Sequence, residues 1–104
     1  MILNSIYALD SKWQQTRELR PSIKIVISLG KEVTWITVCD NGPGIYPEHI
    51  DNVFEPGFTT RPGGGFGFGL YLSKYIVEDR HGGRLSVNSS CGRFCEFCIG
   101  LRNK

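Results

Sequence analysis

The interpretation of this chain depends on two short segments, Asp40-Asn41-Gly42-Pro43-Gly44 and Gly65-Phe66-Gly67-Phe68-Gly69-Leu70. In the first, an acidic residue ends an alternating stretch and is followed at once by a turn rich in glycine and proline. In the second, glycines alternate with phenylalanines and lead into a stretch of helical periodicity. Together they predict two walls of a site for a purine nucleotide, and the remaining segments are interpreted as its scaffold.

A hairpin is expected just before the first segment. Isoleucines alternate through residues 23–29, which predicts a half-buried strand, and Gly30-Lys31 makes the turn. In the second strand the alternation places Ile36, Val38 and Asp40 on one face. A carboxylate among aliphatic side chains is costly unless something donates hydrogen bonds to it. Two interpretations of Asp40 follow: an acceptor for the exocyclic amine of adenine, or the start of an Asx-turn.

Helical spacing indicates two longer helices and one short one. The first covers residues 2–20 and ends before Pro21, which disfavours helix at the preceding residue. A helix of one or two turns is expected at 47–54, and a second long helix from Gly67 to Arg80 with Gly82 as its stop. The second long helix is expected to present one broad face, formed by Leu72, Tyr75, Ile76 and Asp79.

The remaining segments complete a single small domain. Residues 84–88 and 94–99 alternate and predict two closing strands, while residues 55–65 contain too much proline and glycine for regular structure and predict a flap. The 104 residues, 40% of them hydrophobic, suit one domain with a core. The formal charge of +2 is spread along the chain, which excludes a nucleic-acid surface.

The sequence argues against a membrane-spanning segment and against a cysteine redox or metal site. No apolar run approaches the roughly 20 residues of a membrane span, so we expect a cytoplasmic domain without direct membrane contact. Cys95 and Cys98 are three residues apart in a predicted strand, so their side chains point to opposite faces. We therefore expect reduced, structural thiols rather than a redox pair or a metal site.

The glycine cluster by itself leaves two interpretations open. Glycines at a helix start let phosphate oxygens approach backbone N–H groups and the positive end of the helix dipole. A flexible loop ahead of a helix is the alternative. The spacing Gly-x-Gly-x-Gly does not fit the dinucleotide-binding pattern, and the Gly-Lys-Ser/Thr of a P-loop is absent.

The order of these features resembles the nucleotide-binding domain of sensor histidine kinases. That domain belongs to a superfamily shared with gyrase-type topoisomerases, heat-shock chaperone ATPases and mismatch-repair ATPases. The resemblance covers nearly the whole chain and implies the Bergerat fold, a two-layer α/β sandwich with a mixed, largely antiparallel sheet covered on one face by helices. Residues 1–104 would then form one ATP-binding domain that lacks the usual first strand and the start of the first helix.

The resemblance also implies roles for particular residues. Asn4 matches the magnesium-ligating Asn of the family, and Asp40 matches the acid that accepts from adenine. The metal would be Mg²⁺, and Arg61 would reach the phosphates as a catalytic residue together with Asn4. The adenine side of the pocket would include Gly42, Gly44, Ile45 and Cys95. The flap would contribute Phe58, Thr59 and Thr60, and the phosphate side Gly65, Gly67, Gly69 and Leu70.

Several positions depart from the family pattern. Tyr7 stands where many relatives carry Asp, and Phe94 where a Gly is usual. Cys95 replaces a Thr near the adenine-side water, and a thiol is a weaker donor than a hydroxyl, which predicts reduced nucleotide affinity. The general base of the hydrolysing relatives, a Glu one helical turn before the Asn, would fall before Met1.

The implied function is the catalytic domain of a protein-histidine kinase in a two-component system, with ATP as donor. The acceptor would be a histidine on a separate dimerisation and phosphoacceptor domain, and a response regulator would act downstream. His49 and His81 lack the setting of an acceptor, so a surface role is expected for His49 and a helix-end role for His81. Two alternatives stay open: an ATP-hydrolysing module of the chaperone or repair type, and a regulatory fragment without transfer activity.

Overall fold

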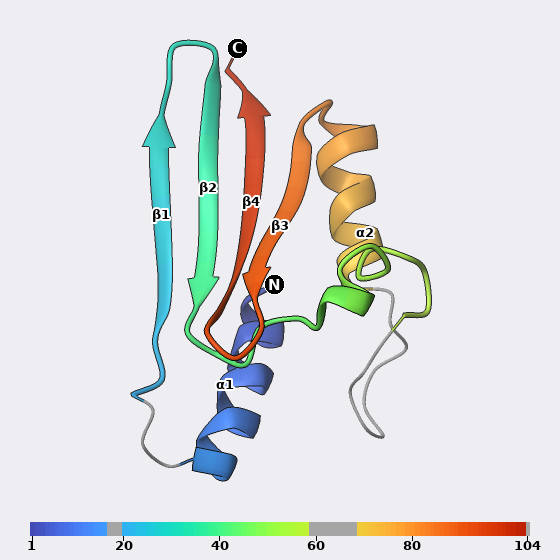
Figure 1. The fold of residues 1–104 in the computed structure, drawn as a ribbon. Helices are drawn as coiled ribbons and strands as arrows, with labels where there is room; N and C mark the ends of the chain where they lie inside the picture. The colour runs from blue at the N-terminus through green and yellow to red at the C-terminus, as the bar shows by residue number, and fades with distance from the viewer. Residues whose placement is uncertain (17–19, 59–68, 104) are drawn as a thin grey trace.

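A four-stranded antiparallel sheet in the order β1-β2-β4-β3 forms the centre of the fold (Figure 1). The computed structural model describes residues 1–16, 20–58 and 69–103. The strands are β1 (Ile23–Leu29), β2 (Val33–Asp40), β3 (Arg84–Ser90) and β4 (Phe94–Arg102). The α/β fold expected from the sequence is confirmed, and within the described part of the chain every strand pair is antiparallel.

The register places the alternating residues of all four strands on common faces. Asp40, at the end of β2, lies opposite Ile23 of β1 and Cys95 of β4, and Val38 lies opposite Phe97. Because side chains alternate along a strand, the face that carries Asp40 also carries the apolar core. Its buried apolar residues, from strands, helices and loops, are Leu9, Val38, Val53, Val77, Leu85, Cys95 and Phe97.

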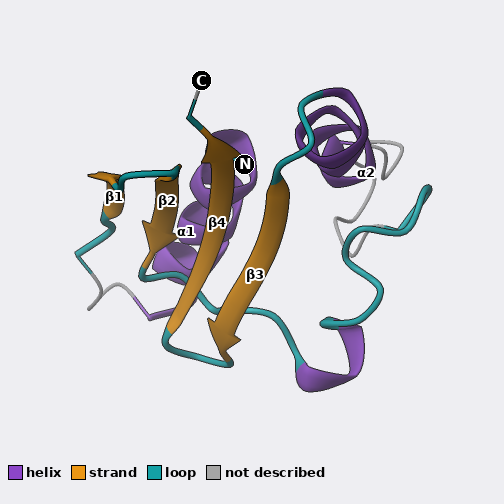
Figure 2. Ribbon diagram, turned by 90° about the horizontal axis from the view of Figure 1, so that it is seen from above, coloured by secondary structure: helices purple, strands orange, loops and turns teal. Residues whose placement is uncertain are grey.

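The described helices lie on that face of the sheet, and none of them lies on the other (Figure 2). The first, α1 (Ile2–Thr16), packs against β2 and β1 and buries Ser5 and Leu9, one helical turn apart. A short 3₁₀ turn, η1 (Pro47–His49), comes after β2 in the chain, with the proline at a permitted first-turn position. The last helix begins as α2 (Gly69–Lys74) and continues as a π-helical segment, η2 (Tyr75–Arg80). No helix in the described ranges is long and apolar enough to cross a membrane.

Strand β1 is more exposed than its alternation predicted. Only Ile23 is half-buried, while Ile25, Ile27 and Leu29 are 52%, 62% and 82% exposed. The expectation of a half-buried strand was wrong because β1 is the edge strand of the described sheet. Helix α1 lies near the start of β1, at Ile23, and does not reach Ile27 or Leu29 (Figure 1).

The last helix packs on the sheet with Val77 rather than with the broad face of Leu72, Tyr75, Ile76 and Asp79. Leu72, Tyr75 and Ile76 are exposed, and the buried residue is Val77. The physical reason is a hydrogen bond that fixes the helix rotation: the backbone N–H of Leu85 donates to Glu78 Oε2 over 3.1 Å. That contact turns Val77 and Glu78 towards β3, so the stripe containing Leu72 faces solvent.

The expected stop of this helix is confirmed. Gly82 has φ +65°, a left-handed conformation that glycine adopts without a steric cost. Its N–H donates to the carbonyl of Glu78, and the N–H of Gly83 donates to that of Val77. These bonds satisfy carbonyls that would otherwise be left open at a helix C-terminus. His81 caps the segment and is exposed, in the helix-end position expected for it.

Candidate functional site

Asp40 is a buried carboxylate at the end of the central strand β2. It is 3% exposed, and the backbone N–H of Gly42 donates to its Oδ1 over 2.9 Å. The Asx-turn interpretation of this residue is therefore confirmed. A carboxylate has about four acceptor positions on two oxygens, so this one bond leaves capacity for a ligand's amine. The turn and the ligand role are compatible in the same side chain.

Gly44 fits into a cradle made by the β3–β4 turn. Its φ is +72°, and a Cβ there would lie 2.5 Å from the carbonyl oxygen of Ser90 and 2.9 Å from that of Phe94. Ser89 Oγ joins both sides: it accepts from the N–H of Ile45 (2.7 Å) and donates to the carbonyl of Phe94 (3.0 Å). The loop after Asp40 is thus held against β3 and β4, and only glycine fits at position 44.

Helix α1 brings the predicted metal ligand to the same end of the sheet. Ala8 lies one helical turn after Asn4, and a Cβ on Gly42 would lie 3.5 Å from the Ala8 methyl carbon. A small residue at position 8 therefore lets the helix approach the Asp40 turn. Asn4 itself is half-buried.

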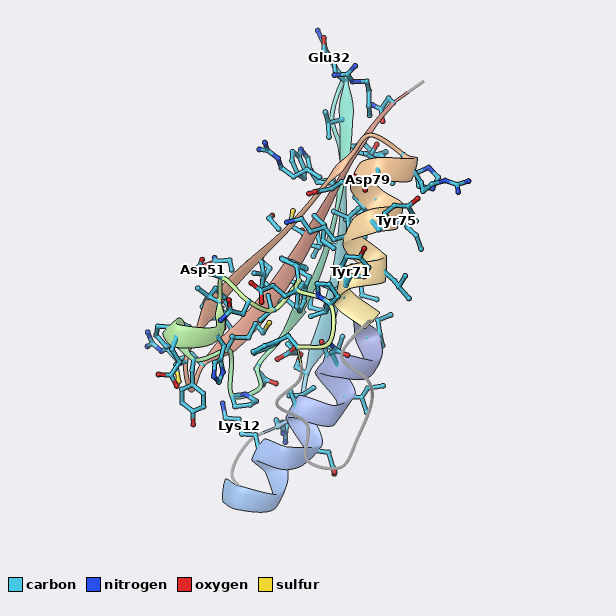
Figure 3. The ribbon with its side chains drawn as sticks, turned by 90° about the vertical axis from the view of Figure 1, so that its right-hand side faces the viewer. Lys12, Glu32, Asp51, Tyr71, Tyr75 and Asp79 are labelled. Atoms are coloured by element: carbon cyan, nitrogen blue, oxygen red, sulfur yellow. The ribbon has the colours of Figure 1, made fainter. Side chains whose placement is uncertain are left out.

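Lys12 fastens the helix to two loops. Its Nζ donates to the carbonyls of Asn41 (3.1 Å), Gly42 (3.1 Å) and Gly92 (2.9 Å). An ammonium group has three donors, so these bonds match its full capacity. Figure 3 shows Lys12 on α1 at this end of the molecule. We infer that Lys12 positions the loop rather than a phosphate.

Cys95 is the neighbour of Asp40 on β4. It is 7% exposed, and burial, reinforced by the charge of Asp40, raises the pKa of its thiol from 9.0 to about 12. The side chain is therefore a neutral thiol at physiological pH. Cys98, three residues on, pairs with Thr37 on the opposite face, which confirms the predicted separation of the two side chains.

The raised pKa of Cys95 predicts a loss of stability in alkali. Between pH 9 and about 12 the thiol ionises in the unfolded chain but keeps its proton in the folded one, so the unfolded state binds fewer protons. The free energy of unfolding should then fall with pH by about 1.4 kcal/mol per pH unit. Urea denaturation of the wild type and Cys95→Ala at pH 7 to 10 measures this difference. Equal pH slopes in the two proteins would contradict the prediction.

The aromatic segment before the flap connects to the core. Phe54 packs edge-on against Phe97, with ring centroids 6.2 Å apart, and Lys74 Nζ lies 4.8 Å from the Phe54 centroid. Phe58 contacts the ring of His49 at 5.4 Å, and His49 also meets Tyr46 at 6.0 Å. The His49 side chain is 29% exposed and contacts the exposed Tyr46, so it is a surface residue, as expected, with aromatic contacts to Tyr46 and Phe58.

Part of the predicted site lies outside the described residues. This holds for Thr59, Thr60, Arg61, Gly65 and Gly67. Gly69 starts α2, where a Cβ would meet no described residue within 4 Å, and Leu70 beside it is half-buried. The structure brings together the residues that were predicted for the adenine side, and it places Gly69 and Leu70 at the start of the helix that packs on β3.

Two hollows of the surface lie away from Asp40. One is lined by α1 and the start of β1, including Leu9, Pro21 and Ile23. The other lies between the segment 51–56 and the last helix, where Asp51, Tyr71, Tyr75 and Asp79 are visible in Figure 3. Neither is lined by the residues predicted to bind a ligand. Inference about the site therefore depends on the contacts of Asp40 rather than on cavity shape.

Three contributors were missed by reasoning from the sequence. The sequence shows that Lys12 lies one helical turn after Ala8 and that Ser89 lies on the same face of its strand as Val87. It does not show that Lys12 binds the Asn41-Gly42 loop or that Ser89 binds Ile45. Ser5 is 1% exposed, and its hydroxyl has no hydrogen-bond partner among the described residues. Its position one turn before Leu9 indicated burial.

Comparison with known proteins gives one family and consistent relatives. The model of the histidine kinase-, DNA gyrase B- and HSP90-like ATPase family matches residues 2–104. A probable C4-dicarboxylate sensor kinase of Bacillus subtilis is 39% identical over 74% of the chain, and the sensor histidine kinase ZraS of Salmonella typhi is 36% identical over 97%. The sensor histidine kinase DcuS of Escherichia coli is 38% identical over 78%. The chain spans 14%, 20% and 15% of these relatives' lengths, respectively.

Proposed function

Because the chain belongs to the histidine kinase-, DNA gyrase B- and HSP90-like ATPase family, we propose that it binds ATP with Mg²⁺ and donates the γ-phosphate to a histidine of a separate phosphoacceptor domain. One observation carries this proposal: the buried Asp40 carboxylate, oriented by Gly42, at the point where α1 meets the sheet. The relatives named as sensor histidine kinases favour this branch of the family.

The residues around Asp40 fit the adenine end of ATP. A fixed carboxylate accepts from an exocyclic amine, and a buried one discriminates strongly because a ligand without the amine leaves it unpaired. Gly42 is buried under α1, and Gly44 is seated in the β3–β4 turn. The loop backbone is therefore fixed before a ligand arrives, which lowers the entropy cost of binding.

Asn4 fits a magnesium ion that is shared with phosphates. Mg²⁺ is commonly held by one or two protein oxygens together with substrate phosphates and water, and no group of three or more His, Cys, Asp or Glu residues forms a metal cage in the described ranges. Magnesium would supply neutralisation of phosphate charge. Asn4 would orient it through the amide oxygen, and Arg61, Gly65, Gly67 and Gly69 would contact the phosphates on the other side.

Transfer would then depend on positioning rather than covalent chemistry by this chain. Ile45, Phe58, Thr59, Thr60 and Leu70 would line the pocket. The acceptor histidine and the response regulator would belong to other domains, as in a two-component system. We propose that residues 1–104 act as one ATP-binding unit of such a protein.

A binding-only role is the second candidate, and Cys95 favours it. The neutral thiol beside Asp40 is a weaker donor than a hydroxyl. An adenine-side water would be held less firmly by it, and ATP affinity would fall. The third candidate, steady hydrolysis, requires a base that activates water.

Labelled ATP separates the three functions. The chain is incubated with [γ-³²P]ATP and Mg²⁺, with and without a purified phosphoacceptor domain from a sensor histidine kinase relative, and binding is measured by calorimetry. We expect acid-labile, alkali-stable label on the acceptor domain and its loss with Asn4→Ala. Phosphate release without an acceptor would favour hydrolysis, and ATP binding without labelling of any acceptor domain tested would favour the regulatory role.

A further inference from the structure

One peptide group in the loop after Asp40 is held from both sides. Its carbonyl, that of Asn41, accepts a hydrogen bond from Lys12 Nζ over 3.1 Å, and its N–H, that of Gly42, donates to Asp40 Oδ1 over 2.9 Å. Consecutive hydrogen bonds polarise one another, so a cation on the carbonyl makes the N–H of the same peptide a stronger donor. Lys12 and Asp40, far apart in the chain, are therefore connected through this peptide.

The other bonds of Lys12 keep that peptide in place. Nζ also donates to the carbonyls of Gly42 (3.1 Å) and Gly92 (2.9 Å), and the N–H of Gly92 donates to the carbonyl of Pro43. The ammonium group thus binds the loop on both sides of the Gly42 Cα and also binds the β3–β4 turn. The bond from the N–H of Gly42 to Asp40 is buried, and there a hydrogen bond to a charged group is stronger than in water. From helix α1, Lys12 therefore stabilises a buried contact of Asp40.

Local backbone sterics do not fix the orientation of this peptide. Position 42 is a glycine, and a glycine backbone has wide rotational freedom because it carries no Cβ. Asn41 is anchored through its side chain, whose Oδ1 accepts from the N–H of Ser22 over 2.8 Å. That bond holds the residue but not its carbonyl. Without Lys12, the carbonyl of Asn41 loses this donor and the peptide can turn, which takes the N–H of Gly42 away from Asp40.

We propose that Lys12 is a positioning residue for base recognition: through the peptide between Asn41 and Gly42, it holds the Asp40 carboxylate in the orientation that accepts from the amine of adenine. This inference rests on the proposed function, in which Asp40 binds the base. A carboxylate that is free to turn loses part of its bond to the amine, because hydrogen bonds weaken steeply away from linear geometry. A purine with an oxygen in place of the amine makes no such bond, so its affinity depends less on Lys12.

Nucleotide selectivity tests the route through Asp40. Calorimetric titration with Mg²⁺ and non-hydrolysable analogues of adenosine and inosine triphosphate gives the preference of each variant for adenine. Lys12→Met should lower that preference about tenfold, and in an Asp40→Asn background it should change both affinities by the same factor. Lys24→Met removes an exposed cation from the other face of the sheet and should leave the preference unchanged. Equal losses for the two nucleotides in the single variant Lys12→Met would show a merely structural role and overturn the proposal.

Amide hydrogen exchange tests the same contact without a nucleotide. Phe97 lies in the buried core on β4, so its amide reports opening of the whole domain. In Lys12→Met, the exchange rate of the Gly42 amide relative to that of Phe97 should rise about tenfold. If the wild type binds neither nucleotide, the proposed function fails; a raised ratio then still supports the hold of Lys12 on Asp40, and an unchanged ratio overturns it. Lys12→Gln, whose shorter amide does not reach three carbonyls, carries both tests if Lys12→Met does not fold.

Discussion

Asp40→Asn should reduce the affinity for ATP roughly 100-fold while the fold persists, because a charge-assisted hydrogen bond to adenine is lost and the amide offers a donor in its place. The Asn oxygen can still accept from the N–H of Gly42, so the turn that Asp40 forms now is preserved. Calorimetric titration of both proteins with a non-hydrolysable ATP analogue and Mg²⁺ measures the loss.

An inosine nucleotide shows whether that loss comes from the base. Inosine carries an oxygen where adenine has its amine, so the wild type should prefer the ATP analogue strongly and Asp40→Asn should lose that preference. Glu96→Gln, on β4 opposite Cys39 on the other face of the sheet, removes the same charge and should change neither affinity. Equal affinity of wild type and Asp40→Asn for the ATP analogue would show that adenine does not meet Asp40.

Gly44→Ala should destabilise the domain by roughly 3 kcal/mol, because a left-handed backbone and a steric clash act together. The added Cβ would meet the Ser90 carbonyl oxygen at 2.5 Å, inside any normal contact distance. In a domain of this size the melting temperature should fall by roughly 15 °C. Thermal unfolding followed by circular dichroism measures the shift.

Gly92→Ala separates the two causes. Gly92 has φ +81°, close to the value at Gly44, yet a Cβ there would meet no atom of the described residues within 4 Å. It should therefore cost only roughly 1 kcal/mol, the backbone penalty alone. If Gly44→Ala and Gly92→Ala are equally stable, then the loop after Asp40 does not press against the β3–β4 turn.

Local patterns predicted the strands and helices and the position of Asp40 at the end of a strand. Alternation placed Asp40 on the same face as Val38, and the stop of the last helix at Gly82 was predicted from the glycine that follows it. The sequence left the rotation of the last helix undecided, because its apolar residues allow two faces and the choice depends on the contact of Glu78 with Leu85 of another element. No local pattern contains that contact.

By itself, the sequence determined the order of strands and helices, the face on which Asp40 lies, and the family resemblance that the family match confirms. These follow from periodicity and from motifs whose spacing is local. Only the tertiary structure decided that Lys12 fastens two loops, that Ser89 holds Ile45, and that β1 is the edge strand of the described sheet. Each of these joins segments far apart in the chain, and such contacts are set by how elements pack rather than by the propensity of any one of them.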